Sequence, residues 1–205
     1  MKAAGEALRA DTQKIAQLVT QLRSEIPACN PSFADKVREG IDTGGAGGKP
    51  LPGSIQDIGA KAKDASSKLA DSLQGARGRY DGLDFCSVNA CSTSFGALGS
   101  LFSPVAAQAN ASLKVITDLR TKNIDPAKAK IAEVQGQLVM VIQMGTVPEA
   151  CNAATKHLVE VANRWDNVQR KFNALETRMK MQSATATKVA QSASAGKSCG
   201  AMAQK

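Results

Sequence analysis

Aromatic side chains and histidine are scarce in this 205-residue chain. Phe, Trp and Tyr together make up 3% of the residues, and there is one His. Because β-sandwiches are built from aromatic and β-branched strands, this scarcity argues against that architecture, and the plentiful Ala, Ser, Lys and Gln favour helices. With 43% apolar residues, the chain can still form a core. We therefore expect a helical domain whose core is thin and aliphatic.

The chain also lacks a long uninterrupted apolar segment. No run approaches the ~18 apolar residues that a membrane-spanning helix needs. The first residues, MKAAGEALRADTQKIAQLV, pass directly into helical periodicity and contain no apolar signal-peptide core. The chain is therefore expected to be either a cytosolic protein or the mature part of an exported protein whose signal peptide has been removed.

Common patterns of catalytic and cofactor-binding residues are missing as well. The cysteines form no CxxC pair, and His157 lies six residues after Cys151, a spacing that places the two on different faces of a helix. Lys49 follows a glycine-rich loop, but Pro50 stands where a phosphate-binding loop needs Ser or Thr. The sequence also shows no acidic and basic side chains whose spacing would bring them together for catalysis. We predict no metal, no cofactor and no enzymatic activity.

Apolar periodicity predicts helices along most of the chain. The expected helices cover residues 3–26, 32–41, 54–80, 106–123, 125–142 and 148–189, with Asp125 and Pro126 restarting a helix after a break. Glycines and prolines predict a flexible loop at 43–53, and the small polar residues 191–205 predict a flexible tail. Residues 1–190 are expected to form one domain.

The last predicted helix has the strongest periodicity. Apolar residues recur at intervals of seven in two series: Cys151, Leu158, Trp165, Phe172 and Met179, and Ala154, Val161, Val168 and Leu175. A seam of this kind indicates that the helix packs lengthwise against its neighbours at a shallow angle. The predicted fold is all-α: an elongated antiparallel bundle of four to five helices with a long C-terminal heptad helix.

The five cysteines, Cys29, Cys86, Cys91, Cys151 and Cys199, all lie at or near predicted helix ends. If the helices alternate in direction, Cys29 and Cys199 meet at one pole of the bundle. Cys151 then meets Cys86 or Cys91 at the other pole, and a local Cys86–Cys91 loop is the alternative. Cysteines placed to staple helix ends favour an exported protein, periplasmic or extracellular, over a cytosolic protein with reduced thiols.

The basic character of the chain permits several partners. Its formal net charge of +8 suits an acidic protein, anionic lipid or nucleic acid. Arg164, Lys171 and Arg178 recur at sevens beside the seam, where they can pair with a neighbouring helix or form a docking stripe for an acidic protein. Nucleic acid is disfavoured because Tyr80 and Trp165 are isolated and no aromatic platform alternates with basic residues.

Residues 85–113 contain no charged side chain. In one interpretation, Gly96, Gly99 and Pro104 fold this segment back as a buried joint at the end of the bundle. In the others, the segment is an exposed apolar binding site for a protein partner or a tip that contacts a membrane. An uncharged segment between long helices resembles the general plan of α-helical pore-forming toxins, which implies membrane insertion. Its small polar residues and two cysteines favour the joint.

These features favour an exported, disulfide-tied helical bundle that binds another protein as a structural or adaptor component of a surface or secretion assembly. The candidate partner-binding residues are Arg164, Lys171 and Arg178 on the basic flank, and Phe95, Leu98, Leu101 and Phe102 in the uncharged segment. Two alternatives stay open. One is a membrane-active protein that inserts residues 85–113, and the other is a cytosolic coiled-coil scaffold that self-associates through the heptad seam.

Overall fold

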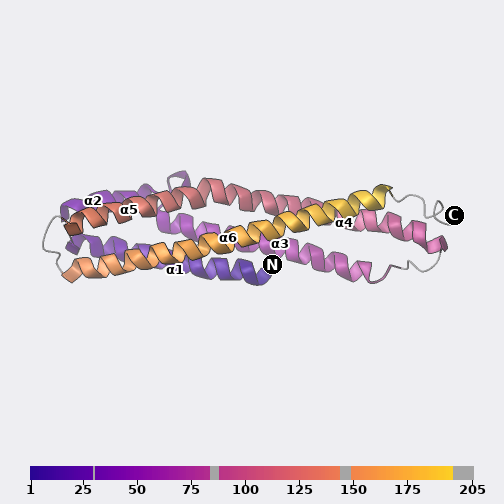
Figure 1. Cartoon of the computed structure of the whole chain (residues 1–205), viewed down its shortest axis with the longest axis horizontal. Coiled ribbons are helices and arrows are strands. Elements are labelled where there is room, and N and C mark those ends of the chain that lie inside the picture. The colour runs from indigo at the N-terminus through magenta and orange to yellow at the C-terminus, as the bar shows by residue number, and fades with distance from the viewer. Residues whose placement is uncertain (30, 84–87, 144–148, 196–205) are drawn as a thin grey trace.

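The computed structural model describes residues 1–29, 31–83, 88–143 and 149–195, with side chains at all of these except 31–33, 88–96, 141–143, 150 and 193–195. This part of the chain is helical and contains no strand, so the predicted all-α class is confirmed (Figure 1). The helices are α1 (Lys2–Cys29), α2 (Pro31–Thr43), α3 (Leu51–Tyr80), α4 (Val88–Leu119), α5 (Asp125–Gln143) and α6 (Glu149–Ala195). They pack lengthwise into a rod (Figure 1).

Four helices form the centre of the rod. Helix α1 packs against α3 and α6, and α4 packs against the same two helices from the other side. The α1–α3 pair is antiparallel and close: a Cβ atom on Gly5 would lie 2.9 Å from Cβ of Ser66, and a Cβ atom on Gly59 would collide with Thr12. Glycine at these two positions therefore allows the backbones to approach.

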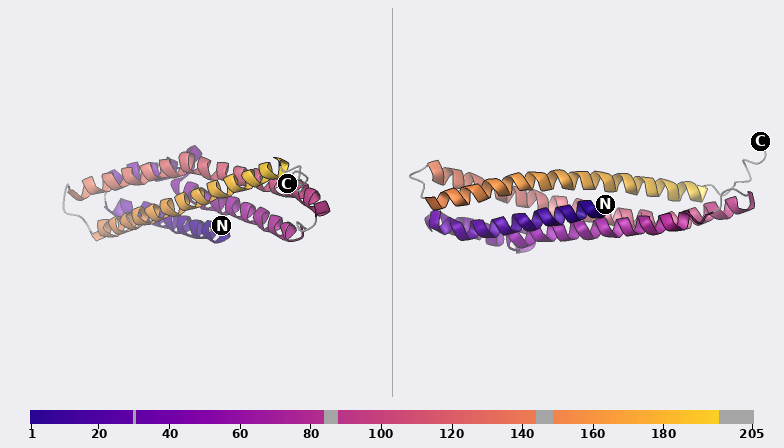
Figure 2. Two further views of the ribbon diagram at one scale, coloured as in Figure 1. Left: turned by 45° about the vertical axis from the view of Figure 1, so that its right-hand side comes forward. Right: turned by 90° about the horizontal axis from the view of Figure 1, so that it is seen from below.

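At two places along the chain, a helix continues in the direction of the helix before it. Helix α2 turns back from the end of α1, and α3 continues in that direction after the short 3₁₀ turn η1 (Ala46–Gly48) (Figure 1). Helix α4 likewise passes into α5 through the π-helical turn η2 (Arg120–Ile124) without reversing. The chain therefore passes along the rod four times, and α6 begins at the same pole where α1 ends (Figure 2).

Helix α5 begins at Asp125 as predicted, but the predicted break before it is absent, because η2 joins α4 and α5 and Asp125 itself has a helical conformation. The backbone N–H of Asp125 donates to the carbonyl of Arg120, five residues back. A proline in a helix lacks a donor and its ring crowds the carbonyl four residues earlier. The wider π turn directly before Pro126 gives that ring room, which explains why the helix continues.

Other helix boundaries also differ from those predicted. Helix α1 continues through Pro27 to Cys29, α3 begins at Leu51 instead of Ser54, and α6 extends to Ala195, into the expected tail. Helix α4 already begins at Val88 and contains Pro104, so residues 88–113 do not fold back and the predicted joint is wrong for this segment. Proline removes one backbone hydrogen bond, and here packing along the helix offsets that loss.

The main core runs along the centre of the rod. It contains the nine seam residues of α6, each at most 3% exposed, together with aliphatic residues of α1, α2, α3, α4 and α5. Trp165 and Phe172 are its largest fully buried side chains. Burying one large apolar side chain stabilises the fold by roughly 1.5–3 kcal/mol, so this continuous core holds the helices together.

Helix α1 begins near the middle of the rod, where Lys2 Nζ lies 2.6 Å from Asp71 of α3 (Figure 1, Figure 2). Beyond that point only α3, α4 and α6 continue. We call this three-helix part, residues 72–83, 88–106 and 180–195, the arm, and the rest of the described chain the body. Arg178 belongs to the body, because it lines a surface pocket together with Ala4 and Ala7 of α1. The arm has its own small core of Ala76, Leu101, Val105, Ala106 and Ala186, with Leu73 and Phe102 partly buried against it.

Candidate functional site

One disulfide closes the pole of the body where α1 ends and α6 begins. Cys29 and Cys151 are bonded, and their Cα atoms are 4.6 Å apart. The predicted pairings of Cys29 with Cys199 and of Cys151 with Cys86 or Cys91 are therefore wrong. The prediction placed the start of the last helix at the pole opposite the end of the first, whereas the chain passes along the rod four times and α6 begins where α1 ends. Cys86 and Cys199 lie outside the described residues, as does the side chain of Cys91.

A polar contact joins α1 and α6 near the same pole. His157 of α6 lies with its Nδ1 atom 2.8 Å from Oε2 of Glu25 on α1, and both side chains are half-buried. His157 follows Cys151 by six residues and Glu25 precedes Cys29 by four. The disulfide and this contact thus join the same two helices within about two turns of each other.

The three basic residues beside the seam have different environments. Arg164 donates to Glu160 of its own helix at 2.8 Å, and this hydrogen bond and charge lower the pKa of Glu160. Lys171 Nζ donates to Asp11 of α1 at 2.6 Å. Arg178 is exposed and forms no ion pair with any described residue. Two of the three candidates therefore make contacts inside the protein, and Arg178 remains open to solvent.

The apolar candidates of the uncharged segment lie on α4 in the arm. Leu101 is buried at 9% exposed, Phe102 is half-buried against the arm core, and Leu98 is half-buried. The side chain of Phe95 lies outside the described residues. Leu101 and Phe102 thus pack inside the arm and do not form a large exposed apolar patch.

A surface groove runs between α3 and α4 along the arm. It has a volume of about 280 Å³ and is lined by Asp71, Ser72, Gly75, Ala76, Arg79, Leu101, Pro104 and Val105. Its floor is apolar, formed by Ala76, Leu101 and Val105, and Arg79 lies toward the end of α3. Sequence reasoning missed this groove. The glycines of α3 were a usable signal, because Gly75 leaves space where other residues of the helix have side chains.

The arm carries an excess of positive charge. Its described basic residues are Arg77, Arg79, Lys180 and Lys188, and its one described acid is Asp81. Lys180 contacts Glu176 of the body at 3.0 Å. In the body, by contrast, basic side chains alternate with acids, as in the pairs Lys63–Glu6 and Arg23–Asp42. The described part of the arm therefore carries a clear excess of positive over negative side chains.

A buried carboxylate, which sequence reasoning also missed, faces the π turn. Glu176 of α6 is 3% exposed, and its Oε2 atom accepts a hydrogen bond from Arg120 at 2.8 Å. Lys180 Nζ lies 3.0 Å from Oε1 without hydrogen-bond geometry. Arg120 is the first residue of η2, so the π turn and the ion pair occur together. The contact fixes the register of α4 against α6.

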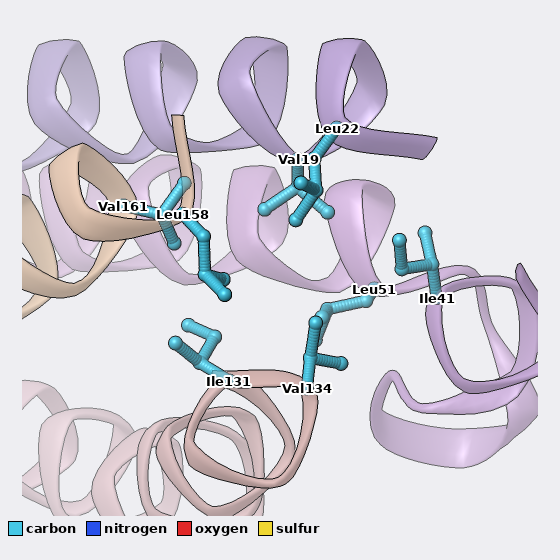
Figure 3. A pocket seen from close by; sticks show the side chains of 8 residues that line it. All are labelled: Val19, Leu22, Ile41, Leu51, Ile131, Val134, Leu158 and Val161. Carbon is cyan, nitrogen blue, oxygen red and sulfur yellow. The ribbon is translucent and has the colours of Figure 1, made fainter. Parts of the chain in front are cut away.

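The structure leaves a small gap where α1, α2, α3, α5 and α6 meet in the body. It has a volume of about 10 Å³ and is lined by Val19, Leu22, Ile41, Leu51, Ile131, Val134, Leu158 and Val161 (Figure 3). All of these side chains are aliphatic and point toward one another (Figure 3). A gap of this size without polar partners stays dry, so we interpret it as a packing gap and not as a ligand site.

Comparisons with known proteins identify no relative. No family model matches the chain, and neither a curated protein nor a solved structure shows significant similarity to it. None of the helices in the described ranges is long and apolar enough to cross a membrane. The described side chains also include no group of three or more His, Cys, Asp or Glu residues placed to hold a metal ion.

Proposed function

We propose that this chain is an exported, disulfide-tied helical-bundle protein that binds another protein as a structural or adaptor component of a surface or secretion assembly. Its role is recognition and not catalysis. Helix α6, packed through its heptad seam, acts as a spine that joins the body to the arm. The body is a rigid support, and the arm presents the binding surface.

The Cys29–Cys151 disulfide is the observation that carries this proposal. It joins residues 122 positions apart and ties the first helix to the last at one pole of the body. Stable disulfides of this kind belong to oxidising compartments such as the periplasm or the extracellular space. A covalent tie at one pole also leaves the opposite end of the rod to meet a partner.

The charge of the arm suggests the chemistry of that partner. Arg164 and Lys171 already contact acids of this chain, and Lys180 lies 3.0 Å from Glu176, whereas Arg77, Arg79 and Lys188 of the arm are exposed. A protein with an acidic surface complements this distribution, and such complementarity chiefly speeds association and excludes wrong partners. We therefore assign partner binding to the arm and not to the whole basic flank of α6.

Mass spectrometry of natively expressed protein tests the exported state. After free thiols are blocked, peptide mapping without reduction is expected to recover the peptide pair that contains Cys29 and Cys151. Recovery of Cys29 and Cys151 as blocked free thiols would place the chain in a reducing compartment and favour the cytosolic scaffold instead.

Crosslinking in intact cells tests the binding role. A photo-crosslinking residue at position 188 is expected to give one defined protein adduct, because Lys188 is exposed on the arm. The matched control is position 170, which is exposed on the body part of the same helix. Adducts at both positions, or at neither, would contradict binding through the arm.

Membrane activity is the second candidate function. Residues 88–113 of α4 form an uncharged helical stretch in and beside the basic arm, a combination that suits an anionic bilayer surface. Leakage of dye from liposomes that contain phosphatidylglycerol, abolished by Phe102→Asp, would favour this function. Intact liposomes at saturating protein would reject it.

A further inference from the structure

We propose that the groove between α3 and α4 in the arm binds an acidic amphipathic helix of a partner protein. This inference rests on the proposed function, because it names the surface and the type of partner. The groove runs along two antiparallel helices from Asp71 to Arg79, a distance of about 12 Å at ~1.5 Å per residue. That length matches roughly two turns of a docked helix.

The lining of the groove defines two requirements for its occupant. Its floor of Ala76, Leu101 and Val105 is apolar and accepts aliphatic side chains spaced three or four residues apart on one face of a helix. Gly75 and Ser72 on one wall are small, so the backbone or side chains of the occupant can come close to α3. Pro104 on the other wall is exposed and rigid. A narrow apolar floor between helical walls favours a helix over a globular surface.

The charged residues at the two ends of the groove determine the sign of the charge that the occupant must carry. Asp71 at one end is neutralised by Lys2 at 2.6 Å. Arg79 at the other end is exposed, and no acidic side chain among the described residues pairs with it. Arg77 and Lys188 add positive charge nearby on the arm. A carboxylate next to the apolar face of the occupant would therefore pair with Arg79, and a basic helix would be repelled.

A second copy of this chain fits the groove poorly. The exposed ends of two arms carry charge of the same sign, which opposes their association. An anionic lipid surface would be attracted by the charge of the arm. Its binding would not depend on the shape of the groove at Gly75. The shape of the groove and the charge of the arm can therefore be tested separately.

Two matched pairs of variants make this separation. Gly75→Leu fills the groove, while Gly78→Leu places the same side chain on the same helix outside the groove lining, and a Cβ atom at either position meets no neighbour. Arg79→Glu reverses the charge at the groove, and Arg77→Glu makes the same change outside it. Both glycine variants should be at least as stable to heat as the parent, because leucine has the higher helix propensity.

The probe is a synthetic helix of roughly 18 residues, about five turns, with leucines on one face and glutamates beside them. A second peptide carries lysine in place of glutamate, and phosphatidylglycerol vesicles serve as a lipid control. Fluorescence anisotropy with the full-length oxidised protein is expected to show tighter binding of the acidic peptide. Gly75→Leu should weaken it at least about tenfold and Gly78→Leu by less than about twofold, where tenfold corresponds to 1.4 kcal/mol. Arg79→Glu should weaken it more than Arg77→Glu.

Equal effects of Gly75→Leu and Gly78→Leu would overturn the groove, as would preference for the lysine peptide or the absence of peptide binding. Vesicle binding that is equal in all four variants, without peptide binding, would also overturn it and assign the arm to lipid. If position 188 still crosslinks to one protein while the groove variants have no effect, the proposed function stands and only the groove fails. If neither assay gives the expected result, both proposals fail.

Discussion

The body and the arm are built from the same helices but differ in how many of them pack together. In the body, α1 and α6 are joined by a disulfide, and most buried side chains belong to one continuous core. In the arm, α3, α4 and α6 continue without α1, and the core consists of five mostly small buried residues. Local stability follows the number of buried apolar contacts, so one helix can be rigid at one end and mobile at the other.

Matched leucine deletions should give the largest difference between the two parts. Leu69→Ala removes a fully buried side chain of α3 in the body and should lower the free energy of unfolding by about 3–5 kcal/mol. Leu101→Ala removes a side chain that is 9% exposed in the arm and should cost about 2 kcal/mol or less, because the thin arm can relax. Urea denaturation measures both, and equal losses would mean that the arm is packed as tightly as the body.

Removal of the disulfide should have the next largest effect. A Cys29→Ser/Cys151→Ser variant should lose about 2–5 kcal/mol of stability in urea denaturation, because the link restricts a long loop of the unfolded chain. A reductant should destabilise the parent but not the double variant; equal sensitivity of the two would contradict the pairing.

The buried carboxylate at the π turn should show a smaller effect. Arg120→Met leaves Glu176 buried with only the exposed Lys180 nearby and should cost about 1–3 kcal/mol. Lys180→Met is the matched control and should cost less, because Lys180 lies mostly in solvent and makes no hydrogen bond to Glu176. Thermal unfolding of the two variants checks the order, and a larger loss for Lys180→Met would reverse the roles assigned to the two cations.

The smallest effect should come from acidification of the body. Arg23 donates two hydrogen bonds to Asp42, and this contact lowers the pKa of Asp42 below its usual 3.8. A lowered pKa in the folded state means that the stabilisation is present above pH 3.8 and is lost as the pH falls through the lowered value. Asp42→Asn should therefore destabilise the protein slightly at pH 7 and not at pH 2. A difference that grows on acidification would contradict this sign.

The helical class and the bundle could be predicted from sequence because they depend on local periodicity. Every residue of the predicted seam of α6 is apolar, and each is buried in the structure. The prolines were harder to interpret. Pro27, Pro104 and Pro126 all lie inside or at the start of helices, since packing or a π turn offsets the lost hydrogen bond.

The cysteine pairing and the candidate site depended on topology, which periodicity does not contain. Cys29 meets Cys151 because the chain passes along the rod four times, an even number, so that α6 begins at the pole where α1 ends. The groove exists because α3 continues past the start of α1 and carries Gly75 there. Glu176 follows a seam residue directly, but only the structure shows Arg120 across from it. Such contacts arise from the relative positions of distant segments.

Hydrogen exchange on the native oxidised protein tests the account most directly. Without ligand, amides of residues 72–80 in α3 should exchange faster than those of residues 55–69 in the same helix, because only the former belong to the arm. Addition of the acidic peptide should then slow exchange at residues 72–79 and 101–105. Uniform exchange along α3, or protection by the peptide within the body, would contradict a rigid body that carries a binding arm.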